Sequence, residues 1–202
     1  LEMTNIIERK RERIFNNIHP GVLIIGFIII ALEVYLQIFG IEARRSLIIY
    51  FSFVPKLFLF QFQELYFGEY YVRFFSHAFL HGDFFHMLLN VVVLIAVGKN
   101  IEENVGLLKF LSIFFISAIS GAFFFQTFEP TQTGPLVGAS SAIYGLLAFF
   151  FGKDLFNRLN NSISIQPVIN IIIMMILIHI PMVLWGSLLF GADIAWQGHL
   201  GG

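Results

Sequence analysis

The sequence of 202 residues contains no cysteine, which excludes disulfide bonds and thiolate metal sites. Charged residues are also scarce, since Asp, Glu, Lys and Arg make up 12% of the chain. An average soluble domain has about 25%. The net charge of -1 offers no basic surface of the kind that binds nucleic acid, so we expect no nucleic-acid partner. No cofactor and no metal are expected either.

Apolar side chains are abundant instead. They make up 57% of the chain, which includes 26 phenylalanines, and the mean hydropathy is +0.82. This composition predicts an all-α membrane protein that is embedded in the lipid bilayer.

The apolar residues fall into runs that can cross a bilayer, for which about 20 helical residues are needed. The predicted spans are residues 21–39, 84–97, 107–128, 136–151 and 167–190. Residues 194–202 begin a sixth run, but nine helical residues cover only about 14 Å. We therefore predict a six-transmembrane-helix bundle whose sixth helix is truncated in this chain, and we expect the natural chain to continue.

The segments outside these runs set the domain organisation. Residues 1–19 are predicted to be a cytoplasmic tail, with residues 1–2 before Met3 interpreted as a cloning remnant, and residues 20–202 to be the membrane domain. Residues 41–83 are too polar to span and too aromatic for a free linker, so one or two interfacial helices are expected there. With the N-terminus inside, the inner segments carry eight basic residues and the outer ones four, as the positive-inside rule favours.

Residues 138–145, Gly-Ala-Ser-Ser-Ala-Ile-Tyr-Gly, place small residues and two hydroxyls at the start of an apolar run. If a helix begins near Ser140, Tyr144 lies one turn further on the same face. The unpaired backbone N–H groups of a helix N-terminus can also stabilise an oxyanion. Alternatively, Ser140 is an N-cap and the small residues serve helix packing.

Two pairs of polar residues with a spacing of four precede or open the second span. His86 and Asn90 share one helix face, and both can donate a hydrogen bond, as an oxyanion hole requires. Hydrogen bonds between helices are the alternative. His77 and His81 lack the glutamate of the zinc motif His-Glu-x-x-His, so hydrogen bonds that shape the loop are expected for them.

The third motif is Trp-Gln-Gly-His-Leu-Gly-Gly at residues 196–202. Glycines beside a histidine let another helix approach closely, which makes His199 the natural general base for a serine across that contact. These motifs hold no Asp or Glu at the same depth to orient it. We therefore predict a Ser140–His199 dyad, with Tyr144 as the ring on which His199 stacks.

Together and in this order, the three motifs resemble the rhomboid family of intramembrane serine proteases. The matching patterns are Gly-x-Ser-x at 138–141, His-x-x-x-Asn at 86–90 and His-Leu-Gly-Gly at 199–202. The resemblance implies a serine endopeptidase that cleaves transmembrane segments of other membrane proteins near the outer face. It implies Ser140 as nucleophile, His199 as base, and an oxyanion hole from the Ser140 N–H, His86 and Asn90. Gly138, Tyr144 and His81 are expected to support this site.

The sequence departs from the family pattern in three places. Ser141 stands where the family often has glycine, Val72-Arg73 where it tends to have Trp-Arg, and Glu102-Glu103-Asn104 where it tends to have Glu-x-Arg. Arg73 itself matches a family arginine in the long first loop. Loop anchoring and the role of Ser141 are thus the points that sequence leaves open.

Met182 and Trp185, beside Pro181 in the fifth span, are interpreted as a lateral gate, with a bent span and an interfacial Trp as the alternative. A soluble-type serine hydrolase would need Gly-x-Ser-x-Gly on a strand-to-helix turn, whereas this chain has Ala142 in the last place and no predicted strands around it. Two other functions remain open. One is a rhomboid-like pseudoprotease that binds membrane clients without catalysis. The other is a small transporter or proton channel that uses Glu33 and the histidines; otherwise Glu33 is assigned to packing or water contact. The expected location is the inner membrane of a prokaryotic cell.

Overall fold

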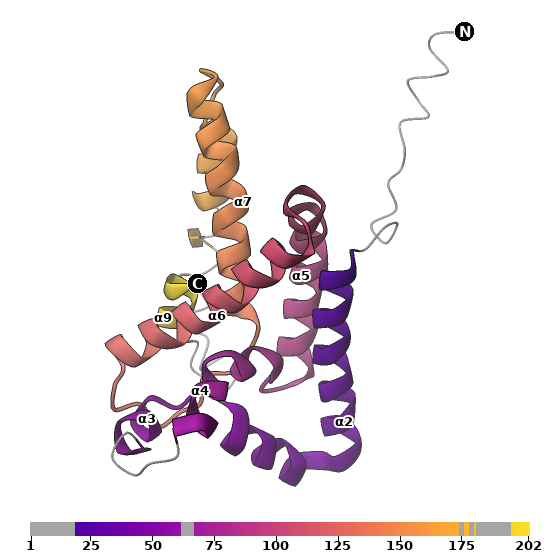
Figure 1. Ribbon diagram of the computed structural model, residues 1–202, viewed down its shortest axis with the longest axis vertical. Coiled ribbons are helices and arrows are strands. Elements are labelled where there is room, and N and C mark those ends of the chain that lie inside the picture. Colours follow the sequence, from indigo (N-terminus) through magenta and orange to yellow (C-terminus); the bar gives the residue numbers. More distant parts are fainter. Residues whose placement is uncertain (1–18, 62–66, 174–175, 178–179, 181–194) are drawn as a thin grey trace, which may run out of the picture.

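The computed structural model describes residues 19–61, 67–173, 176–177, 180 and 195–202 (Figure 1). Within these ranges the regular elements are helices, apart from one isolated β-bridge. Helices α2 (Pro20–Phe51), α5 (Phe84–Val105) and α6 (Leu107–Phe128) are long and apolar enough to cross a membrane. The six-span count stays a prediction.

Helix α2 contains the first predicted span and continues beyond it. Gly40 has a φ of +77°, and this left-handed residue bends the helix, so that residues 41–51 turn away from the direction of the first leg (Figure 1). Pro20 occupies the first turn, where a missing N–H costs nothing. The next two N–H groups donate to a carboxylate from a distant helix: Gly21 and Val22 donate to the Glu102 oxygens over 2.8 and 2.9 Å.

The predicted interfacial region, residues 41–83, contains more helices than expected. After the end of α2 come α3 (Pro55–Gln61), α4 (Phe67–Ser76) and the 3-10 turn η1 (His77–Phe79). The region is tied down by an aromatic cluster of Phe53, Tyr70, Phe74, Ala122, Phe125 and Leu136. Arg73 donates to the Ser52 carbonyl over 3.2 Å and lies over the Tyr70 ring. An arginine on a tyrosine thus anchors the loop that lacks the family's tryptophan.

A two-way backbone bridge joins this loop to the segment before the serine motif. Leu136 N–H donates to the Phe53 carbonyl over 2.7 Å, and Phe53 N–H donates back over 3.3 Å. Residues 136–139 therefore belong to an extended segment and turn, whereas a span from residue 136 was predicted.

Helix α6 has the predicted bounds, whereas α5 and α7 (Ser140–Asn160) run further than predicted. Residues 98–105 were expected in a charged turn, but they continue α5, and the turn is reduced to Gly106 with a φ of +81°. Residues 153–160 were expected in a polar loop, but they continue α7, where Arg158 pairs with Asp154 one turn earlier over 2.8 Å. In the extension of α5, Glu102 is buried and Glu103 is exposed, so neighbouring charges lie on different faces of the helix.

Helix α9 (Trp196–Gly201) packs in the angle between α6 and α7 (Figure 1). The contact depends on small residues. A Cβ added at Gly121 would lie 2.6 Å from Ser141 Cβ and 2.7 Å from the Gly198 carbonyl oxygen. A Cβ at Gly145 would overlap Ser117. This close packing brings the C-terminal histidine motif beside the start of α7.

Candidate active site

The site is centred on the first residue of α7. Ser140 begins that helix, and His199 comes from α9, 59 residues further along the chain. The Nε2 atom of His199 lies 2.7 Å from Ser140 Oγ, which is a short hydrogen bond. Both residues are half-buried. The geometry thus pairs a hydroxyl with an imidazole in the way that an activated nucleophile requires.

Tyr144 fixes the plane of the histidine ring. It follows Ser140 by one helical turn, and its ring is stacked on His199 with centroids 4.7 Å apart and an angle of 7° between the planes. Gln197, two residues before His199, donates to Glu129 at the end of α6 over 3.1 Å. Two side chains of α9, Gln197 and His199, therefore make contacts that hold the helix against α6 and α7.

Gly138 and His86 border the same space as Ser140. Gly138 has a φ of +111°, a conformation that favours glycine. A Cβ there would lie 2.8 Å from His86 Nε2 and 3.8 Å from Ser140 Oγ. The hydrogen atom of glycine thus lets the His86 imidazole cover the turn that leads into the serine.

The donors that an oxyanion hole would use lie around this turn. Within the described part of the chain no side chain caps the N-terminus of α7 at Ala139, and Ser140 contributes one of the first backbone N–H groups of the helix, which have no partner within it. Asn90 is 7% exposed, and its Nδ2 donates to the His86 carbonyl over 2.8 Å, which leaves its second amide hydrogen as a further donor. Asp83 caps α5 by accepting from His86 N–H over 2.9 Å.

His77 and His81 hold the turn from behind. The His77 carbonyl accepts from Gly138 N–H over 2.9 Å, and its Nε2 bonds to the Ala118 carbonyl over 3.2 Å. His81 Nε2 accepts from Ala139 N–H over 3.5 Å, and its ring meets the His86 ring edge-on at 5.0 Å. Burial lowers the pKa of His77 to about 4. Burial and the electrostatic effect of His86 lower the pKa of His81 to about 3. His77 and His81 are therefore neutral at pH 7.

The adjacent residues Ser140 and Ser141 have different neighbours. Ser141 is completely buried, and a Cβ at Gly198 would lie 3.2 Å from its Oγ. Among the described residues this hydroxyl has no hydrogen-bond partner. Ser141 therefore lies in the contact with α6 and α9, whereas Ser140 faces His199.

Sequence reasoning missed one partnership near the site. Glu33 was assigned to packing or water contact, but its carboxylate pairs with Arg44 over 2.6 Å, and the side chains are 3% and 11% exposed. A single carboxylate in an apolar run signals a buried partner. The partner was hidden because Arg44 lies beyond the unforeseen bend at Gly40. The proposed gate residues Met182 and Trp185 lie outside the described residues.

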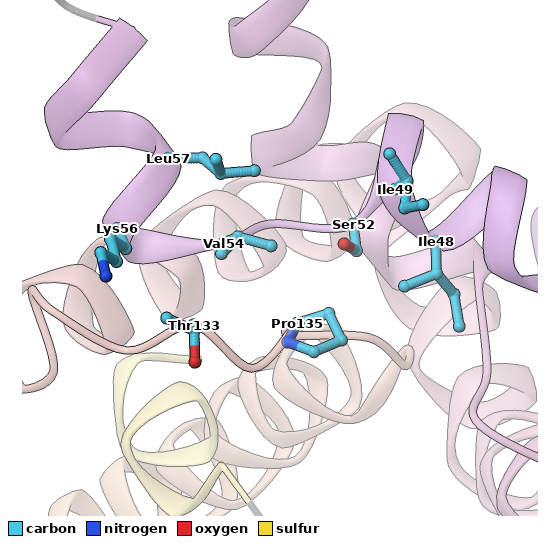
Figure 2. Close-up of a pocket in the computed structure, with 8 residues that line it drawn as sticks. All are labelled: Ile48, Ile49, Ser52, Val54, Lys56, Leu57, Thr133 and Pro135. Atoms are coloured by element: carbon cyan, nitrogen blue, oxygen red, sulfur yellow. The ribbon is translucent and has the colours of Figure 1, made fainter.

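A hollow of about 320 Å³ lies elsewhere on the loop, between the end of α2, the start of α3 and residues 133–135 (Figure 2). Ile48 and Ile49 form one wall, Leu57 and Pro135 approach from other sides, and Lys56 stands at an edge (Figure 2). None of its eight lining residues is a predicted site residue. The candidate active site thus rests on the Ser140–His199 contact and not on this hollow.

The chain is similar to one protein family and to several named proteins. The family model of the Rhomboid domain matches residues 68–202, about two thirds of the chain. Rhomboid-like protease 1 of Toxoplasma gondii is 34% identical over 131 residues, 62% of this chain and 41% of the relative. Rhomboid-like protease 3 of the same organism is 30% identical over 126 residues, 61% of this chain and 44% of the relative.

A further relative carries a different description. Inactive RHOMBOID-like protein 8 of Arabidopsis thaliana is 29% identical over 99 residues, which are 48% of this chain and 28% of the relative. The chain thus spans less than half the length of these relatives. The extent of the Rhomboid match, together with the span-length apolar helices, shows that the chain is an integral membrane protein that belongs to the rhomboid family.

Proposed function

We propose that the chain is an intramembrane serine endopeptidase with a Ser140–His199 dyad, and that residues 20–202 form its protease domain. The observation that carries the proposal is the 2.7 Å contact between His199 Nε2 and Ser140 Oγ at the start of α7. A serine hydroxyl is a weak nucleophile until an adjacent base takes its proton. The relatives named as proteases support the same reaction class.

In the proposed reaction, His199 Nε2 removes the Ser140 hydroxyl proton while Oγ attacks the carbonyl carbon of a peptide bond. The tetrahedral intermediate collapses, the C–N bond breaks, and the imidazolium gives its proton to the leaving amine. Water then attacks the acyl-enzyme ester with His199 again as base, and Ser140 leaves with the returned proton. Stacking on Tyr144 keeps the imidazole in the plane that both transfers use.

The oxyanion of the two tetrahedral intermediates would be held by the Ser140 N–H together with His86 and Asn90. His86 borders the same space as Ser140 Oγ, and Asn90 lies one turn below it in α5. Each such donor is worth about 2.7 to 4 kcal/mol of transition-state stabilisation. His86 can act in this way as a neutral imidazole that donates through one ring nitrogen.

Substrates in this proposal are transmembrane segments of other membrane proteins, with small or helix-breaking residues near the outer face. A peptide bond must leave its helix before a nucleophile can reach it. The distribution of basic residues favours a cytoplasmic N-terminus. The relatives described above come from eukaryotes, so the comparisons do not support the expected prokaryotic inner membrane.

The test is labelling of the purified, detergent-solubilised chain with a fluorophosphonate probe, which forms a covalent bond to activated serines. We expect labelling of the wild type and of Ser141→Ala, and its loss in Ser140→Ala and His199→Ala. Labelling retained in Ser140→Ala would contradict the assignment of the nucleophile. A folded wild type that does not label would contradict the protease proposal.

The second candidate is a client-binding protein without catalysis, favoured by the similarity to a relative named inactive. The same labelling experiment distinguishes the protease from the client-binding protein, because binding a client does not require a reactive Ser140.

A further inference from the structure

Arg44 forms a hydrogen-bond network that reaches from α2 to His81, beside the candidate active site. Its guanidinium pairs with both oxygens of Glu33: Nη2 lies 2.6 Å from Oε1, and Nη1 lies 3.1 Å from Oε2. Gln37 also donates to Glu33 Oε1 over 2.7 Å. Eleven residues of straight helix would separate Glu33 and Arg44 by about 16 Å along the axis. The bend at Gly40 is therefore what brings the two side chains together.

The same guanidinium makes a third bond outside its own helix. Arg44 Nη1 donates to the His81 carbonyl over 2.7 Å. The His81 ring in turn accepts from Ala139 N–H and meets the His86 ring edge-on. Through these two contacts of the His81 ring, Arg44 is connected to the Ala139 backbone just before Ser140 and to the His86 imidazole.

We propose that Arg44, held in place by Glu33, is a positioning residue for the oxyanion side of the active site. It fixes the His81 carbonyl and, through His81, the placement of His86 and of the turn at residues 138–139. The proposal rests on the proposed protease function, because it names what supports that same site.

The buried Glu33–Arg44 ion pair costs desolvation free energy, so holding the two parts of α2 together does not by itself explain it. Moving two charges out of water carries a penalty that apolar side chains of similar volume avoid. What the charged pair provides beyond packing is a charge-assisted hydrogen bond to a carbonyl in the loop, with a fixed direction. That bond ends at His81, five residues before the proposed oxyanion donor, where a rigid placement affects reactivity.

The experiment removes the hydrogen bond to His81 in two ways, one that also removes both buried charges and one, described below, that keeps them. Glu33→Gln is the reference, since its amide oxygen still accepts from Arg44 while the buried carboxylate charge is gone. The double variant Glu33→Gln/Arg44→Met then removes the bond to His81 without leaving a buried carboxylate unpaired. Arg45→Met is the matched control, because the neighbouring Arg45–Glu42 pair is 67% and 79% exposed.

The readout is the inactivation of Ser140 by the fluorophosphonate probe, resolved into a maximal rate and a probe affinity. We expect the maximal rate of the double variant to fall about tenfold below that of Glu33→Gln, with the affinity within about twofold. Arg45→Met should match the wild type. Arg44→Lys, which keeps the charge beside Glu33, should give an intermediate rate, and it serves as the test if the double variant does not fold.

A second measurement keeps the inference separate from the proposed function. Backbone hydrogen exchange at residues 81–87 should accelerate in the double variant and not in Arg45→Met, whether or not the wild type labels. A wild type that does not label would overturn the protease proposal alone. Unchanged exchange, or an unchanged maximal rate in a wild type that does label, would overturn the role of Arg44.

Discussion

The ring of Tyr144 lies flat on the ring of His199, with 4.7 Å between centroids and 7° between planes. This contact joins α7 to α9 at the point where His199 meets Ser140. An imidazole without such support can rotate about its side-chain torsions, and each rotation moves Nε2 away from Ser140 Oγ.

Tyr144→Leu should therefore reduce the maximal rate of probe labelling, by between about twofold and tenfold. This range corresponds to the energy of one aromatic stack, about 0.5 to 1.5 kcal/mol. Tyr144→Phe keeps the ring and should stay closer to the wild type. Equal losses in Leu and Phe would show that the hydroxyl and not the ring matters.

Gly138→Ala should damage both fold and activity. The φ of +111° strains any other residue, and the new Cβ would lie 2.8 Å from His86 Nε2. We expect about 1 to 3 kcal/mol less stability in a detergent unfolding titration, together with slower probe labelling. Gly152→Ala is the matched control, because its Cβ would meet no atom of the described residues within 4 Å and helix propensity favours alanine there. A loss of equal size at Gly152 would argue against the structural cause.

Acid should destabilise the fold through His77 and His81. Their pKa values in the folded chain are about 4 and about 3, whereas an exposed histidine has about 6.5. Between these values the unfolded chain binds more protons, so the stability they contribute is complete above pH 6.5 and is lost as pH falls toward 4. The expected loss is about 1 kcal/mol per histidine for each pH unit.

Unfolding titrations in detergent at pH 7.5, 5.5 and 4.5 measure this slope. The variant His77→Asn, which has no titratable group at residue 77, should show about half of it. A stability that stays level down to pH 4.5 would contradict the burial of both neutral rings.

Glu102→Gln should weaken the start of α2. The carboxylate accepts from Gly21 and Val22 with separate oxygens, and an amide has only one acceptor oxygen and no charge for the helix N-terminus. The expected cost is about 1 to 2 kcal/mol in unfolding free energy. Glu103→Gln, at the exposed neighbouring position, should cost nothing measurable. Equal values for the two variants would contradict the capping role.

Much of the candidate site could be predicted from the sequence, because the residues proposed for its chemistry belong to short local motifs. The small residues at 138–145 and 198–202 predict a close contact between helices. A histidine within a membrane helix is usually functional or hydrogen-bonded, because burying it in lipid is costly. The bounds of α6 could also be predicted, since a predominantly apolar run begins after Gly106 and ends at Glu129-Pro130.

The ends of α5 and α7 were not readable in the same way. A cluster of charges predicts a loop when only hydropathy is considered, but Glu102 is buried beneath the start of α2 while Glu103 faces out. The ion pair of Glu33 was equally hidden, because it depends on the bend at one glycine. Contacts between distant segments decide such cases, and a local pattern does not contain them.

The bridge between Phe53 and Leu136 has a consequence for how the protein responds to heat. Only three residues separate Leu136 from Ser140, so the proposed nucleophile is connected to the cluster formed by the loop and α6 as well as to its own helix. Loops open at lower free energies than packed helices. On warming, we expect Ser140 to lose its proposed reactivity several degrees before the helical circular dichroism signal declines, since the turn before it depends on a contact with a loop.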